Sequence, residues 1–387
     1  MLSFGDTRIA FKDKSDAHLK KSYWLFFLVK SSGLVKTGAG MIQVLQKSGI
    51  SLRWILKPTI FDHFCGGETI EECKGAIHKF QESKIKVVLD YAAEGIESEE
   101  QFDNTRNRIL ETIQLSKSEK GIAFAVFKFS GIARTSLLEK VNAHEFLTEA
   151  ESDEWERVFK RADDICREAY NNNLPVMIDA EETWIQGAID EMTEKLMQMY
   201  NKNNAIVYNT LQMYRTDRLF YLKEQTQKAK MNGYKPAFKL VRGAYMEKER
   251  IRAQKHNYAS PVHPNKNDTD SAFDNAMIFC LENADQISVC IGTHNETSCE
   301  KAIKKMNELH IPSDSPGIFF SQLTGMSDHI SYNLAYHGYN VAKYLPYGPL
   351  KLAIPYLIRR AQENTSVSGQ TGREINLLRK EMKRRRK

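Results

Sequence analysis

Short apolar segments recur along the middle of the chain, and each precedes a stretch with helical spacing of its apolar residues. Strands that alternate with helices in this way form a parallel sheet. Eight such units predict a closed (β/α)8 barrel, and no Gly-x-Gly-x-x-Gly segment follows any of them to favour an open dinucleotide-binding sheet. The eight segments lie at residues 85–91, 123–129, 175–181, 205–212, 237–245, 287–294, 318–323 and from Val341 onward.

The chain before the first strand lacks this alternation. Its apolar run Tyr23–Val29 lies between lysines and is far too short to cross a membrane. No secretory signal or transit segment is recognisable, which predicts a cytoplasmic protein. We therefore expect an N-terminal helical arm over residues 1–82, a catalytic barrel over residues 83–366 and a basic tail over residues 367–387.

Charge and cysteine content narrow the class of protein. The 387-residue chain has a formal net charge of +6, to which the basic end Met382–Lys387 contributes strongly. Such an end can meet an anionic membrane or a nucleic acid, but it is more often a solvated terminus. Sparse basic patterning elsewhere argues against nucleic-acid binding. The six cysteines lack ligand spacing, so neither a metal site nor a disulfide framework is predicted.

Polar side chains stand at the ends of most of the predicted strands. In a (β/α)8 barrel the chemistry lies at the carboxyl ends of the strands and in the loops beyond them. Any single one of these residues could simply face water. The whole set is expected to lie together at the carboxyl ends of the strands. It therefore predicts a site, because buried charges need partners. Its members are Asp90, Lys128, Asp179, Gln212, Lys239, Arg242, Tyr245, Thr293, His294, Gln322 and Tyr344.

Two neighbouring arginines follow the last predicted strand. Pro349 suits the first turn of a helix, and Arg359 and Arg360 lie further along it. Their planar guanidinium groups match a carboxylate or a phosphate, and Glu363 has the spacing to hold either one. The alternative is that these arginines form the solvated face of an amphipathic helix.

The cationic excess at the strand ends indicates anionic ligands. A phosphate-bearing cofactor and a carboxylate substrate would both use it. The residues alone leave open a different chemistry, in which Lys128 or Lys239 forms a Schiff base in a barrel lyase. No Gly-x-Ser-x-Gly elbow is present to indicate a serine hydrolase.

Several motifs together resemble the flavin-dependent proline dehydrogenases. They occur in the right order from about Val87 to Asn364 and at the ends of the right strands. The motifs are Val126–Phe129, Val176–Glu182, Lys239–Tyr245, Gly292–Asn295, Gln322–Met326, Tyr344–Gly348 and Arg359–Asn364.

The resemblance implies a distorted (β/α)8 barrel that holds FAD. Arg359 and Arg360 would bind the proline carboxylate together with Lys128, while Glu363 holds the arginines. The pocket around the pyrrolidine ring would be shaped by Asp179, Tyr245, Leu323 and Tyr344. The residues serving the flavin would be Gln212, Lys239, Arg242, Gly243, Ala244, Thr293, His294 and Gln322, with Lys239 near flavin N5.

The implied reaction is hydride transfer from proline C5 to flavin N5, giving Δ1-pyrroline-5-carboxylate in the first step of proline catabolism. A quinone would take the electrons, and peripheral contact with the inner face of a membrane would serve that transfer. The resemblance implies a monofunctional member of the proline dehydrogenase family. It does not indicate the oligomeric state. Lys239 and Arg242 depart from many bacterial relatives, which carry arginine and lysine there. The alternative is a 4-hydroxyproline dehydrogenase of the same fold. Tyr344 favours L-proline as the substrate, because its side chain fills the room that a ring hydroxyl needs.

Overall fold

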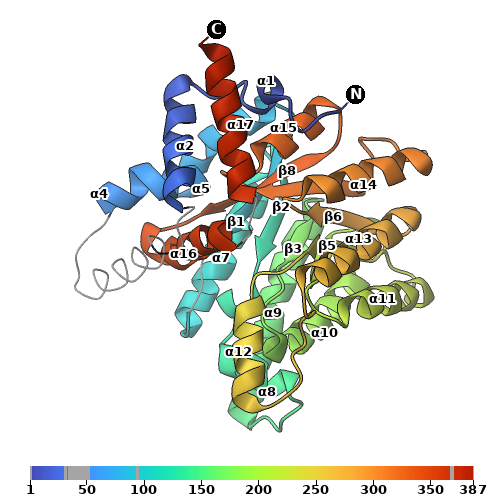
Figure 1. Cartoon of the computed structure of the whole chain (residues 1–387). Coiled ribbons are helices and arrows are strands. Elements are labelled where there is room, and N and C mark those ends of the chain that lie inside the picture. Colours follow the sequence, from blue (N-terminus) through green and yellow to red (C-terminus); the bar gives the residue numbers. More distant parts are fainter. Residues whose placement is uncertain (1, 30–32, 34–52, 93–95, 367–369, 387) are drawn as a thin grey trace. The chain divides into compact units, whose positions relative to one another are not determined.

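Eight strands form a closed barrel in which each strand neighbours the next one along the chain (Figure 1). The computed structural model describes residues 2–29, 33, 53–92, 96–366 and 370–386. The pairs from β2 to β7 run parallel, so the predicted (β/α)8 barrel is confirmed. The strands are β1 (Ile85–Tyr91), β2 (Ile122–Phe127), β3 (Val176–Ile178), β4 (Val207–Gln212), β5 (Ala237–Val241), β6 (Ser288–Gly292), β7 (Ile318–Leu323) and β8 (Val341–Tyr347).

Four strands, β2 among them, end before their predicted segments do, which places candidate site residues such as Lys128 in loops. The other three are β3, β5 and β6. Loops at the carboxyl ends of barrel strands are where such folds carry their chemistry. The residues left beyond the ends of β3, β5 and β6 are Asp179–Glu181, Arg242–Tyr245, Thr293 and His294.

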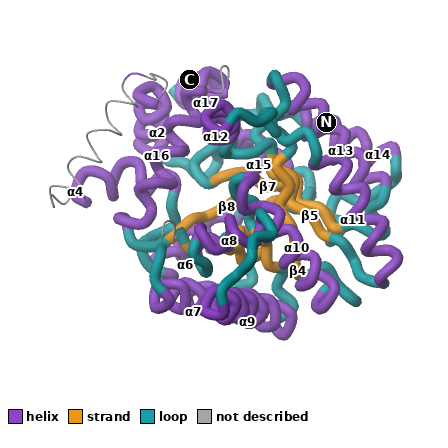
Figure 2. The backbone as a smooth tube through the Cα atoms, turned by 90° about the horizontal axis from the view of Figure 1, so that it is seen from below, coloured by secondary structure: helices purple, strands orange, loops and turns teal. Residues whose placement is uncertain are grey.

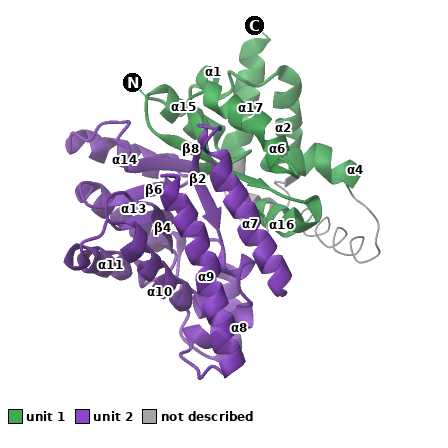
Figure 3. Ribbon diagram, turned by 180° about the vertical axis from the view of Figure 1, so that it is seen from behind, with its two compact units in different colours: residues 1–87, 92–94, 322–387 green, residues 88–91, 95–321 purple. Residues whose placement is uncertain are grey.

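The chain divides into two compact units (Figure 3). Unit 1 comprises residues 1–87, 92–94 and 322–387, and unit 2 comprises residues 88–91 and 95–321. Strands β2 to β6 therefore belong to unit 2 and β8 to unit 1. The domain boundaries expected after residues 82 and 366 stay predictions.

Helices follow the strands of unit 2, as Figure 2 shows with strands in orange and helices in purple. Side chains at several helix starts accept the backbone N–H groups that a helix leaves unpaired. Thr148 and Glu151 form a reciprocal capping box, and Asn295 accepts from two backbone N–H groups. The helices are α7 (Glu99–Leu115), η2 (Phe129–Gly131), α8 (Thr135–Asn142), α9 (Glu149–Asn171), α10 (Thr183–Tyr200), α11 (Arg218–Asn232), α12 (Met246–His256), α13 (Lys266–Glu282) and α14 (Glu296–Glu308).

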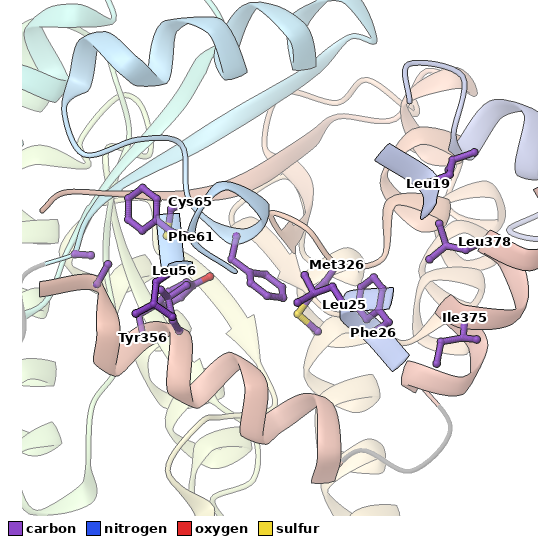
Figure 4. Close-up of a cluster of buried hydrophobic side chains, with 14 of the residues drawn as sticks. Leu19, Leu25, Phe26, Leu56, Phe61, Cys65, Met326, Tyr356, Ile375 and Leu378 are labelled. Carbon is purple, nitrogen blue, oxygen red and sulfur yellow. The ribbon is translucent and has the colours of Figure 1, made fainter. Parts of the chain in front are cut away.

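Unit 1 combines helices from both ends of the sequence around one apolar cluster (Figure 4). Among the buried members are Leu19 and Phe26 near the N-terminus and Tyr356 near the C-terminus. Removing this much apolar surface from water is the main term that stabilises such an assembly. The helices are α1 (Thr7–Ala10), α2 (Asp16–Val29), α4 (Arg53–Leu56), η1 (Lys57–Phe61), α5 (Asp62–Phe64), α6 (Ile70–Glu82), α15 (Asp328–Tyr336), α16 (Leu350–Ser366) and α17 (Gln370–Arg385).

The basic end expected to be solvated is exposed at Lys383 and Arg384, but it belongs to a packed helix, α17. Its side chains Ile375, Leu377 and Leu378 are buried in the unit 1 cluster. Arg385 also donates to Asp16 Oδ1 at 2.9 Å and to the Phe11 carbonyl oxygen at 2.7 Å. The few apolar residues lie on one face of the helix, and this amphipathic spacing lets a strongly basic segment pack against the rest of unit 1.

The apolar run on α2 divides between the core and the surface. Leu25 and Phe26 are buried, whereas Trp24, Phe27 and Leu28 are exposed. Within the described residues, no helix is long and apolar enough to span a membrane.

Candidate active site

A buried ion pair links two strand ends in unit 2. Lys239 lies on β5, and Asp179 directly follows β3. The Lys239 ammonium donates to Asp179 Oδ1, and the two side chains are only 7% and 14% exposed. The structure thus brings together a residue predicted to lie near flavin N5 and one predicted to shape the substrate pocket. Sequence spacing did not indicate this pairing.

Gln212, at the end of β4, joins the loops after β3 and β5. Its Nε2 donates to the Glu181 carbonyl oxygen at 2.7 Å, and its Oε1 accepts from the Ala244 backbone N–H at 3.1 Å. Backbone groups therefore hold both ends of the amide. Their hydrogen bonds determine which end of the side chain is the oxygen and which is the nitrogen. Two predicted cofactor residues, Gln212 and Ala244, are in direct contact.

Arg242 is held on several sides within unit 2. Its guanidinium donates to Asp270 at 2.5 Å, to Thr293 Oγ1 at 2.8 Å and to Ser298 Oγ at 3.0 Å. It also lies over the ring of Phe273, 4.4 Å from the centroid. Arg242 and Thr293 were both predicted to serve the cofactor, and the structure brings them into contact.

Sequence reasoning missed Asp270 and Ser298 as partners of Arg242. Burial raises the pKa of Asp270, but hydrogen bonds from Lys266 and Arg242 outweigh it, so the pKa lies below its usual value. Asp270 therefore stays ionised opposite Arg242. Both residues lie on helices, so no strand-end signal could have identified them.

Gly243 allows a close approach that no other residue would permit. Its φ of +122° lies in a region that L side chains rarely adopt, and a Cβ there would lie 1.8 Å from Tyr214 Cδ1. The Tyr214 backbone N–H donates to the Arg242 carbonyl oxygen at 2.7 Å, which fixes the loop against that ring. Tyr245 follows two residues later and is buried at the start of α12.

Gly243→Ala should destabilise the protein by about 2 kcal/mol, because it adds backbone strain and overpacking at one site. Urea unfolding monitored by circular dichroism measures the change. Gly75→Ala is a matched control, since an added Cβ there meets nothing within 4 Å. Equal stabilities of the two variants would contradict the packing argument.

Glu181 is a buried carboxyl group that the sequence motif contained but to which no role was given. Its Oε1 accepts from the Ser130 backbone N–H at 2.9 Å, and its Oε2 accepts from the Ser130 hydroxyl. The carboxyl group thereby holds the turn just beyond Lys128, which precedes η2 and is half-buried. Burial raises the pKa of Glu181 to about 7, although the Ser130 hydrogen bonds and the charge of Lys128 oppose this shift.

This pKa predicts a pH-dependent stability. Because the pKa of Glu181 rises from 4.5 to about 7 on folding, the folded protein keeps a proton that the unfolded chain releases. The stabilising contribution is present below pH 4.5 and is lost as the pH rises through about 7. Glu181→Gln should flatten this part of the profile and gain up to roughly 3 kcal/mol over the parent protein at pH 8.

Urea unfolding between pH 4.5 and pH 8 tests this expectation. Glu191→Gln, at an exposed position on α10, is the control and should keep the parent profile. The same slope in Glu181→Gln and the parent would show that Glu181 does not carry the pH dependence.

In unit 1, hydrogen bonds fix the end of β7 and tie the residue after it to the middle of β8. Gln322 Oε1 accepts from Ser331 Oγ at 2.8 Å, and the Thr324 backbone N–H donates to the Tyr344 carbonyl oxygen at 2.9 Å. Gln322 and Tyr344 are buried, and Leu323 is half-buried. The predicted residues Gln322, Leu323 and Tyr344 therefore lie on adjoining backbone, with Tyr344 inside β8 and not at its end.

The arginine pair lies on α16, which begins one residue after Pro349 as predicted. Arg360 is only 8% exposed, and its guanidinium lies over the Tyr356 ring at 5.2 Å from the centroid. Arg359 is half-buried. For Arg360 the interpretation as a solvated helix face is therefore wrong. Glu363 lies on the same helix, but its predicted contact with the arginines falls outside the described side chains.

His294 follows Thr293 in the loop after β6 and is half-buried. Across the described residues, no group of three or more His, Cys, Asp and Glu side chains is arranged to hold a metal ion. The cationic and amide side chains at the strand ends suit an anionic ligand.

Comparison with known proteins assigns the class and then the family. The fold is shared with proline utilization A (PutA) from Bdellovibrio bacteriovorus, with a TM-score of 0.75 at 19% identity over 96% of this chain and 40% of that chain. The family model described as "Proline dehydrogenase" matches residues 73–373. The chain belongs to the proline dehydrogenase family and is accordingly an oxidoreductase.

Relatives across nearly the full length support this membership. The chain is 31% identical to "Proline dehydrogenase 1, mitochondrial" of Dictyostelium discoideum, over 98% of this chain and 74% of the relative. It is 29% identical to "Hydroxyproline dehydrogenase" of Xenopus laevis, over 99% of this chain and 90% of that relative. The resemblance read from the strand-end motifs is confirmed.

Proposed function

We propose that the protein oxidises L-proline to Δ1-pyrroline-5-carboxylate with FAD as cofactor, in the first step of proline catabolism. The observation that carries the proposal is the polar network of Gln212, Lys239 and Arg242 at neighbouring strand ends, in a chain of the proline dehydrogenase family. A Schiff-base lyase that used Lys239 would need it as a free nucleophile, but its ammonium is engaged by Asp179. An absorption spectrum, with and without L-proline, decides for or against the other lysine of that alternative, Lys128.

The donor set in unit 2 fits a flavin. Lys239 and Arg242 supply cations, and Gln212 supplies an amide that its backbone partners hold in one orientation. The exposed backbone at Gly243 and Ala244 leaves room for a close approach. We assign these residues to the cofactor, and the family resemblance adds Thr293, His294 and Gln322 to the assignment.

The substrate carboxylate is assigned to Arg359 and Arg360, because two guanidinium groups match its planar oxygens. The participation of Lys128 and the support from Glu363 rest on the family resemblance. Asp179, Tyr245, Leu323 and Tyr344 are assigned to the surroundings of the pyrrolidine ring. When bound, FAD supplies the two-electron oxidation by accepting a hydride from C5.

The protein's own residues orient the substrate, whose amine must be deprotonated before hydride leaves. The nitrogen lone pair forms the C=N bond as hydride leaves C5, and the amine proton goes to water. Fixing the carboxylate sets the position of C5, and orientation of this kind supplies several kcal/mol, up to roughly 7–11 in favourable systems. Lys239 adds a positive charge that favours the developing negative charge of the reduced cofactor.

We further propose that a quinone accepts the electrons, and that a cytoplasmic protein reaches it by peripheral contact with the inner face of a membrane. Support comes from the basic last turn of α17, with Lys383, Arg384 and Arg385. Both arginines also form ion pairs with Glu381, which reduces the positive charge available to bind anionic lipid.

A second candidate is the oxidation of 4-hydroxyproline, because one relative bears the name hydroxyproline dehydrogenase. Tyr344 is the residue that decides between the two. Its buried ring is expected to occupy the room that a ring hydroxyl would need.

An absorption spectrum of the purified protein, before and after anaerobic addition of L-proline, tests the function. A yellow protein with bands near roughly 380 and 450 nm that bleach with L-proline is expected, since these bands are a general property of flavins. Bleaching by 4-hydroxyproline alone would favour the second candidate. A colourless protein that takes up no added FAD would overturn the assignment, and borohydride trapping of a lysine adduct would then test the lyase.

A further inference from the structure

The loop between β7 and α15 connects Leu323 to the rest of unit 1 in a strained conformation. Gly325 and Ser327 both have positive φ angles, +79° and +50°. A Cβ at Gly325 would lie 2.5 Å from the His63 carbonyl oxygen, so the backbone is packed closely there. A segment in this conformation persists only when its surroundings hold it.

A fully buried lysine holds this loop from β8. The Lys343 ammonium donates to the Met326 carbonyl oxygen at 2.6 Å and contacts the Leu323 carbonyl oxygen at 3.3 Å. Its third partner is Asp328 Oδ1 at 2.8 Å. An ammonium group has three donors, and these three acceptors use all of them.

The same loop is tied to both ends of the sequence. The second carboxylate oxygen of Asp328 forms an ion pair with Lys14 of the N-terminal arm. The Ser327 backbone N–H donates to Glu374 on α17. The Met326 side chain is buried beside Leu25 and Phe26 in the unit 1 cluster (Figure 4).

Leu323 packs against that cluster as well, and it is half-buried. Lys343 holds the Leu323 carbonyl group and therefore also fixes the position of the Leu323 side chain. The hydrogen bonds between the barrel strands join backbone groups to each other. They need neither the charge of Lys343 nor its side-chain hydrogen bonds. An apolar side chain would fill the same strand position without a buried charge.

We propose that Lys343 is a positioning residue, which holds the β7–α15 loop so that Leu323 forms one wall of the pocket for the substrate ring. The inference rests on the proposed function and extends it to the N-terminal arm, because Lys14 shares Asp328 with Lys343. The arm and α17 thereby contribute to ring recognition without touching the substrate.

Two carboxylate probes separate this role from a merely structural one. Cyclopentanecarboxylate has the ring and the carboxylate, whereas acetate has the carboxylate alone. For the FAD-loaded Lys343→Met variant, we expect the inhibition constant of cyclopentanecarboxylate against L-proline to rise at least tenfold. The constant for acetate should change less than twofold. Lys86→Met, which removes an exposed lysine from β1, should leave both constants unchanged.

The triple variant Lys14→Met/Asp328→Leu/Lys343→Met guards against a simple failure to fold, since it removes the three linked charges together and leaves none of them without its partner. It should recover the thermal stability lost by the single variant while keeping the poor affinity for the ring probe. Amide hydrogen exchange gives a readout without activity: the Met326 and Ser327 amides should exchange at least tenfold faster in both variants than in Lys86→Met.

Equal losses for both probes, or unchanged constants and unchanged exchange, would overturn the positioning role. A parent protein that does not oxidise L-proline would instead overturn the proposed function. In that case the exchange measurement still decides whether Lys343 holds the loop.

Discussion

Arg360→Met should lower kcat/KM for L-proline by roughly a thousandfold, mainly through a higher KM. Truncating one partner of a desolvated charge pair typically costs about 2–5 kcal/mol, and about 4 kcal/mol corresponds to this factor. The side chain is only 8% exposed and rests on the Tyr356 ring, so solvent weakens its attraction for an anion little. Steady-state oxidation of L-proline with an artificial electron acceptor measures the change.

Two further variants show whether the effect belongs to carboxylate binding. Arg360→Lys keeps the charge but loses the planar fork, so it should recover only part of the loss. Arg8→Met, at a side chain that is 72% exposed, should leave kcat/KM unchanged. If Arg360→Met loses kcat at constant KM instead, the arginine acts on the reacting atoms and not on the bound carboxylate.

The barrel could be predicted from the sequence because its signal is repeated. Each unit carries a short apolar segment and an amphipathic helix, so errors at one boundary do not alter the class of fold. The ends of β2, β3, β5 and β6 were placed too late, since the residues that close each segment, such as Lys128, Asp179 and Thr293, lie in the loops beyond the strands. The position of α17 was missed because its basic residues dominate the sequence while three buried apolar side chains determine its packing.

The candidate site was predictable as a set of residues but not as a set of contacts. Strand-end position and family motifs identify Lys239, Asp179 and Gln212 individually. Which of them pair depends on the order of strands and on loop conformation, neither of which a local pattern contains. The partners contributed by helices, Asp270 and Ser298, carry no strand-end signal at all.

The pairing of Lys239 with Asp179 leads to the second large effect. Asp179→Leu should lower the free energy of unfolding by about 4 kcal/mol, because it removes the carboxylate that pairs with the buried Lys239 ammonium. Urea unfolding of the protein without added ligand measures this loss. Glu111→Leu is a useful comparison, since that carboxylate and its partner Arg108 are both about half exposed. It should lose much less.

The double variant Lys239→Met/Asp179→Leu then separates folding from chemistry. An apolar pair of similar volume should restore most of the stability, because the two desolvated charges are removed together. Oxidation of L-proline should nevertheless stay at least a hundredfold below the parent, since the cation assigned to the cofactor is gone and electrostatic groups of this kind contribute roughly 3–4 kcal/mol. Recovery of both stability and activity would show that the pair is structural alone. Loss of activity in a stable double variant would show that Lys239 and Asp179 have two roles. They would stabilise the fold and also take part in the reaction.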